Sequence, residues 1–92
     1  MFKAFIGIPK GETEKVRKVC ENIKKKDETF RYDIMKTTLE TRDKDGIALK
    51  DKFENLLVLY SSTLVDANKR AGWFIHKCNS AKLADYFWVK ES

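Results

Sequence analysis

The stretch FKAFIGIPKGETEKV, residues 2–16, constrains the fold more than any other part of the chain. Its first half alternates apolar and small side chains and ends at Pro9, a pattern typical of a strand that stops at a turn. Glu12 and Glu14 follow, and acidic side chains favour the first turn of a helix, where the helix dipole is positive. The stretch therefore predicts a strand that passes directly into a helix.

Apolar residues spaced three and four apart predict two amphipathic helices. The stripe of the first helix consists of Val16, Val19, Cys20 and Ile23. Lys24–Lys26 close this helix, because cations suit the negative end of the dipole. Ser61–Thr63 supply cap candidates for the second helix, which we expect to end at Asn79 or Ser80. The stripe of the second helix consists of Leu64, Ala67, Ala71, Phe74 or Ile75, and Cys78.

Four stretches predict strands. They are residues 2–8, Phe30 to about Leu39, Leu56–Tyr60 and Asp85–Val89. The resulting β-α-β-β-α-β order fits one α+β domain over residues 1–92, a ferredoxin-like sandwich with an antiparallel sheet, both helices on one face and an extended second connection. We expect its core to contain Val16, Val19, Ile23, Leu64, Ala71 and Val58.

The extended connection between the second and third strands is ambiguous. Asp45-Gly46 is a hairpin signal. The following IALKDKFE fits either a returning strand or a short helix that leads to Phe53, so the structure of residues 40–54 stays open.

A formal net charge of +5 permits nucleic acid, an anionic membrane or an acidic protein as the partner, but interleaved Asp and Glu do not choose among them. No apolar run approaches membrane-spanning length and no apolar leader is present, so we expect a soluble cytoplasmic protein without membrane contact. Cys20 and Cys78 lie far apart without metal-ligand spacing. They predict buried thiols, no metal site and no cofactor.

Two stretches, AFIGIPKGETEKVRKVCENI and LLVLYSSTLVDANKRA, resemble the RNA-recognition-motif family. The resemblance implies the same fold and places Phe5 where that family has a base-stacking aromatic residue. The family has two further aromatics on its third strand. If Tyr60 ends that pattern, Asn55 and Leu57 stand in their places. Since recognition of single-stranded RNA depends on such stacking, the resemblance extends to the fold more than to the binding face.

The second helix carries a basic face opposite its apolar stripe. Cations beside an exposed indole can contact phosphates and stack on a base. The alternative is that Trp73 packs beneath the long connection and that the lysine run at the end of the first helix is only a solvated helix face. The nucleic-acid-binding candidates are Lys69, Arg70, Trp73, His76, Lys77, Phe5, Lys24, Lys25 and Lys26.

The sheet face away from the helices predicts a second interface. If Ala4, Ile6 and Ile8 point to the helices, Phe5 faces outward. We expect Leu57, Leu59, and Tyr86 and Trp88 or their neighbours, to share that face. Monomers rarely leave such a face bare, so a partner protein, a second copy in a homodimer, or the long connection is expected to cover it. The protein-interface candidates are Phe5, Leu57, Leu59 and Trp88.

Two functions remain open. The first is a small binding protein, not an enzyme, that acts on RNA or an RNA-containing complex. The second is an inhibitor or adaptor that binds protein through the apolar sheet face. In composition alone, small lysine-rich domains of this kind resemble counter-defence and host-takeover proteins of phages. A hydrolase has the least support, because no nucleophile, base and orienting group stand at recognisable spacing.

Overall fold

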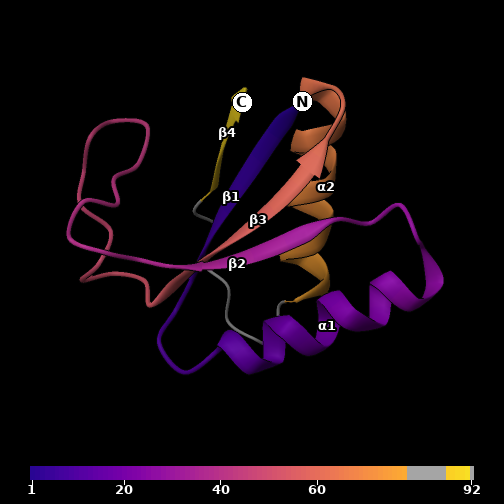
Figure 1. Ribbon diagram of the computed structural model, residues 1–92, viewed down its shortest axis with the longest axis horizontal. Coiled ribbons are helices and arrows are strands. Elements are labelled where there is room, and N and C mark those ends of the chain that lie inside the picture. Colours follow the sequence, from indigo (N-terminus) through magenta and orange to yellow (C-terminus); the bar gives the residue numbers. More distant parts are fainter. Residues whose placement is uncertain (79–86, 92) are drawn as a thin grey trace.

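The computed structural model describes residues 1–78 and 87–91, and the side chain of Phe87 is not part of that description. The elements are β1 (Phe2–Ile8), α1 (Thr13–Lys26), β2 (Tyr32–Lys36), β3 (Asn55–Ser61), α2 (Leu64–Lys77) and β4 (Phe87–Glu91). The strands form one antiparallel sheet in the order β2-β3-β1-β4 (Figure 1). The predicted ferredoxin-like α+β fold is confirmed.

Several element boundaries differ from the sequence expectation. The second strand begins at Tyr32, later than the expected Phe30, and the third strand extends to Asn55 and Ser61, beyond the expected Leu56 and Tyr60. The second strand ends at Lys36 because the side chain of the buried Thr37 donates to backbone oxygens of Phe53 and Glu54, which closes the strand at this point. At the C-terminal side, the described part of β4 runs from Phe87 to Glu91, beyond the predicted end at Val89. The predicted strand residues Asp85 and Tyr86, and the expected helix end at residues 79–80, lie outside the described residues.

The main core lies between the helices and one face of the sheet. Phe30 and Phe74 stack there with their ring centroids 6.4 Å apart. Both predicted stripes point into this core, although Val19 is only partly buried. Leu64 is the exception, since half of it (50%) is exposed in the first turn of α2. The buried residues of this core are Ala4, Ile6, Ile8, Val16, Cys20, Ile23, Phe30, Leu57, Leu59, Ala71, Phe74 and Cys78.

The register of β3 corrects the expected outward face. Ala4 lies opposite Leu59 and Ile6 lies opposite Leu57, and residues directly opposite one another share a face. Leu57 (0% exposed) and Leu59 (1% exposed) therefore point toward the helices, and their predicted outward orientation is wrong. The sequence LLVLY is apolar at every position, so it contains no alternation from which the orientation could be predicted. Val58 is buried on the opposite face instead.

The arm, residues 37–54, packs over that opposite face (Figure 1). Leu49, Phe53 and Leu56 form a second apolar cluster, and Phe5 and Trp88 pack against it. Of the covers considered for this face, the described residues show the arm, whose contacts run from Gly7 to Phe5 and Trp88.

Residues 40–54, for which the sequence fitted either a returning strand or a short helix, contain one isolated strand bridge and one helical turn. Arg42 and Ala48 form an isolated bridge across the turn at Asp45-Gly46, where Gly46 has a φ of +80°. One helical turn follows, in which the backbone N–H groups of residues 52 and 53 donate to the Leu49 carbonyl. This turn brings Phe53 onto the sheet.

In the described part of the chain, no helix combines the length and the apolar character needed to cross a lipid bilayer.

The close approach of Phe53 to Gly7 gives a direct test of the arm's position. A Cβ atom at residue 7 would lie 2.6 Å from the Phe53 ring, well inside contact distance. Gly7→Ala is therefore expected to lower the free energy of unfolding by about 1–3 kcal/mol, the usual cost of overpacking. The same substitution in a Phe53→Ala background should cost much less, as measured by chemical denaturation. Equal costs in both backgrounds would show that the ring does not lie over Gly7.

Candidate nucleic-acid interface

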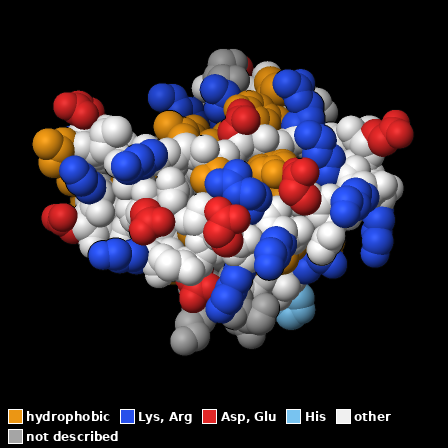
Figure 2. All heavy atoms as spheres, turned by 60° about the horizontal axis from the view of Figure 1, so that its bottom comes forward, with side chains coloured by type: hydrophobic (Ala, Val, Ile, Leu, Met, Phe, Trp, Pro, Cys, Tyr) orange, Lys and Arg blue, Asp and Glu red, His pale blue; other side chains and the backbone are white. Residues whose placement is uncertain are grey.

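The positive charge of the chain is concentrated in the helices. Helix α1 carries six Lys or Arg residues against two Glu, and α2 carries three against one Asp. Their net charges of +4 and +2 together exceed the +5 of the whole chain, so the strands, the arm and the other connections contribute no net positive charge. Figure 2, in which the α1 side of the molecule comes forward, shows Lys and Arg side chains spread over this face with acidic side chains between them.

A hollow of about 460 Å³ lies between the two helices, and we call it the α1–α2 groove. Val19 and Ile23 give it apolar side chains, while Lys25, Lys26 and Lys77 supply ammonium groups. The described residues that line it are Val19, Asn22, Ile23, Lys25, Lys26 and Lys77, and none of these is acidic. The groove therefore joins the lysine run of α1 to the basic end of α2.

Trp73 lies next to the groove on α2. It is 49% exposed, and the Lys77 Nζ one helical turn later lies 5.4 Å from the centroid of its ring. This contact is a cation–π interaction. The alternative expectation, that the long connection covers Trp73, is not what the structure shows, because the arm packs on the other face of the sheet. Lys77 therefore lines the groove and also contacts the accessible indole ring of Trp73.

The remaining candidates on the helices are placed less favourably. Arg70 Nε bonds Asp66 Oδ2 at 2.9 Å within α2, so its charge already has a partner. Lys69 and His76 are exposed on the same helix and do not line the groove. Lys24 lines a different hollow, on the side of Phe30 and Tyr60.

Phe5 lies apart from all of these residues. Its ring stacks on Trp88, with centroids 4.9 Å apart and planes 15° from parallel, on the sheet face away from the helices. The structure therefore does not unite the predicted stacking aromatic of β1 with the basic helix face. Asn22, which sequence reasoning missed, does line the groove, and only the placement of the helices relative to each other reveals it.

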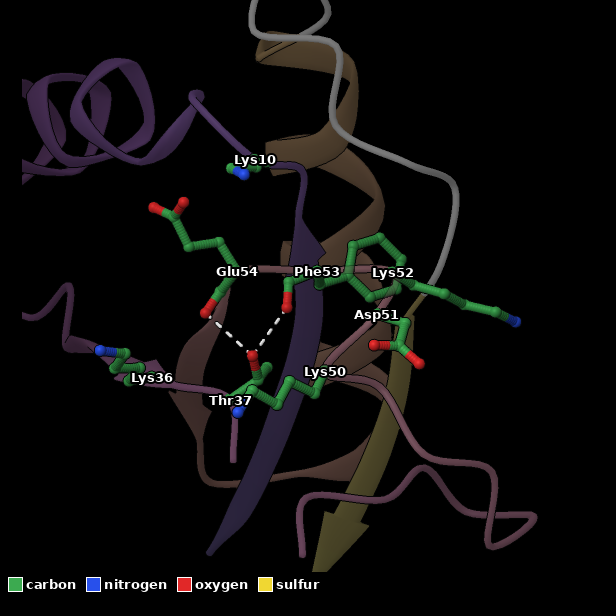
Figure 3. Close-up of a pocket in the computed structure, with 8 residues that line it drawn as sticks. All are labelled: Lys10, Lys36, Thr37, Lys50, Asp51, Lys52, Phe53 and Glu54. Atoms are coloured by element: carbon green, nitrogen blue, oxygen red, sulfur yellow. Dashed lines mark hydrogen bonds between the residues drawn. The ribbon is translucent and has the colours of Figure 1, made fainter. Parts of the chain in front are cut away.

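A second lysine-rich hollow, of about 220 Å³, lies where the arm meets the ends of β1 and β2 (Figure 3). Its lining residues are Lys10, Lys36, Thr37, Lys50, Asp51, Lys52, Phe53 and Glu54. The Thr37 hydroxyl is bound inside it, 2.7 Å from the Phe53 carbonyl oxygen and 2.9 Å from that of Glu54. Figure 3 shows the Lys52 side chain directed away from Lys10 and Lys36, and two carboxylates accompany the lysines. These side chains do not converge on one anion.

The titratable groups of the core have little reactivity at neutral pH. Burial raises the pKa of the Cys20 thiol to about 12 and that of Cys78 to about 11, so both stay protonated. A protonated thiol is a poor nucleophile. Across residues 1–78 and 87–91, no group of three or more His, Cys, Asp and Glu side chains is placed to hold a metal ion.

Comparison with protein-family models, with curated proteins and with solved structures finds no match to this chain. The functional interpretation therefore rests on the geometry just described.

Neighbouring residues on α2 give a matched test of that geometry. Phe74 is fully buried, so Phe74→Ala is expected to cost about 3–5 kcal/mol of unfolding free energy. Trp73→Ala removes a half-exposed ring and should cost less than about 1 kcal/mol. Thermal and chemical denaturation of both variants provides the comparison. A loss at Trp73 as large as that at Phe74 would show that the indole is structural and is not available to a ligand.

Proposed function

We propose that this protein is a non-enzymatic binding protein for single-stranded RNA, alone or within a ribonucleoprotein, and that the α1–α2 groove is its contact site. The observation that carries the proposal is the convergence of Lys25, Lys26 and Lys77 on one hollow whose described lining includes no acidic residue. Lysines that neutralise phosphates release bound counterions, which favours binding without reading sequence.

Trp73 adds the feature that separates a single strand from a general polyanion. A half-exposed indole at the edge of a phosphate-binding groove can stack on an unpaired base. In a duplex the bases are already stacked on each other, so the ring would have no base to contact. Binding is accordingly expected to tolerate different sequences and to favour unpaired strands.

The second hypothesis, an adaptor that binds protein through the apolar sheet face, loses two of its four expected interface residues in the structure. Leu57 and Leu59 are buried under the helices and offer no surface to a partner or to a second copy. Phe5 and Trp88 do lie on the face in question, partly buried and stacked on each other. A protein interface on this face would therefore not include Leu57 and Leu59, whereas Phe5 and Trp88 are partly accessible there.

Salt dependence of binding tests the groove. For a fluorescent oligouridylate, each of Lys25→Gln, Lys26→Gln and Lys77→Gln should lower the slope of log affinity against log salt by about 0.7, as one phosphate contact is lost. Trp73→Ala should cost about 1–3 kcal/mol of affinity with the slope unchanged, because the indole carries no charge.

Lys44→Gln is the matched control, since Lys44 is an exposed lysine on the arm and lies outside the groove. Its slope should equal that of the unmodified protein. If Lys44→Gln lowers the slope as much as Lys26→Gln does, the attraction is spread over the whole basic surface and the groove is not the site.

A further inference from the structure

On the sheet face away from the helices, the described contacts of the arm reach Phe5 and Trp88 and do not extend to the opposite end of the sheet. Outward side chains on this face form rows that cross the strands, because residues directly opposite one another lie side by side. The row nearest the arm contains Met35, Leu56 and Gly7, and Phe53 lies over Gly7. The middle row contains Asp33, Val58, Phe5 and Trp88. The outermost row contains Arg31, Tyr60, Lys3 and Lys90, and we call the outer two rows the open end.

The middle row supplies an apolar floor. A hollow of about 410 Å³ lies over it, with Val58 (3% exposed) at the base and Met35 (44% exposed) at one side. The residues that line this hollow are Lys3, Phe5, Asp33, Ile34, Met35, Val58 and Tyr60. The space is suited to an apolar side chain that enters from outside.

The outermost row concentrates cations. Lys3 and Lys90 lie directly opposite each other on adjacent strands, an arrangement in which like charges repel. Lys3 Nζ and the Arg31 guanidinium lie 5.8 and 5.6 Å from the centroid of the Tyr60 ring. Within residues 1–78 and 87–91, none of these three cations forms an ion pair with a carboxylate.

The Asp33 carboxylate, which lines the hollow, already has a hydrogen-bond partner. The Tyr60 hydroxyl donates a hydrogen bond to Asp33 Oδ2, and this bond raises the pKa of the Tyr60 phenol, which therefore stays protonated. The open end consequently places Lys3 at the hollow and Lys90 and Arg31 in the row beside it. Among the described residues that line the hollow, the acidic one is Asp33, which is hydrogen-bonded to Tyr60.

We propose that the open end docks an acidic segment of a partner protein that carries an apolar side chain. The apolar side chain enters the hollow over Val58, and the carboxylates of the segment approach Lys3, Lys90 and Arg31. This charge complementarity selects acidic segments and speeds their encounter with the protein. The inference does not depend on RNA binding, since the open end and the α1–α2 groove lie on opposite faces of the sheet.

RNA fits this surface less well than a peptide does. Phe5 is stacked on Trp88 and is only partly exposed. Its neighbour on β3 is the aliphatic Val58, so β3 supplies no ring opposite Phe5 on which a second base could stack.

Selection from a displayed library of random short peptides tests the proposal. The whole chain is the target, and enriched peptides are then measured by calorimetry. We expect them to carry Asp or Glu beside a bulky apolar residue. Lys3→Glu and Arg31→Glu should each weaken their binding by about tenfold or more. Met35→Ser should weaken it severalfold. Lys18→Glu, an equal charge change at an exposed lysine of α1, should leave it within about twofold.

Circular dichroism establishes that each variant is folded before binding is compared. Arg31 lies outside the regular strands, so Arg31→Glu serves as the second test if Lys3→Glu perturbs the sheet. Three results would overturn the proposal. One is enrichment of peptides without acidic residues, or no enrichment at all. Another is binding that Lys3→Glu and Arg31→Glu leave unchanged. The third is an oligouridylate that loses affinity on Lys3→Glu and keeps it on Lys25→Gln, which would assign the open end to RNA.

Discussion

The contact of the Phe53 ring with the backbone at Gly7 holds the arm against the sheet face that the helices leave free. Only a residue without a side chain leaves room for the ring, since a Cβ atom at position 7 would come within 2.6 Å of it. With Phe53 in place, Leu49 and Leu56 complete a second apolar cluster and the arm covers one end of the outward face. Without this contact, the whole outward face of the sheet would be exposed, and an apolar surface of that kind is rarely left uncovered in a monomer.

This arrangement separates two surfaces with different chemistry. The helices carry the excess of positive charge and form the α1–α2 groove beside an exposed Trp73. The open end of the sheet combines a row of cations with an apolar hollow. Because the sheet lies between them, a strand of RNA in the groove and an acidic peptide on the open end would not compete for space. A protein of this size could then connect an RNA to a second protein.

Local sequence patterns predicted the secondary structure well, and they predicted long-range contacts poorly. The stripe Val16, Val19, Cys20 and Ile23 and the Thr63 cap were recognisable because helix periodicity and capping involve neighbouring residues. The orientation of Leu57 could not be predicted from the sequence, because LLVLY is apolar throughout and its register depends on pairing with β1. The groove was also hidden, since Lys26 and Lys77 belong to different helices and only packing brings them to one hollow. No local signal indicated that Phe53 would pack on Gly7.

The proposed location of RNA binding, on the helices and away from the sheet face, can be tested most directly by nuclear magnetic resonance. Backbone and indole N–H resonances of the unmodified protein would be followed during titration with a short oligouridylate. The largest shifts are expected at Asn22, Lys25 and Lys26 in α1, and at Trp73 and Lys77 in α2, while Phe5, Val58 and Tyr60 stay near their starting positions. Shifts concentrated at Phe5, Val58 and Tyr60, with α1 and α2 unaffected, would contradict this division and would place the RNA on the sheet.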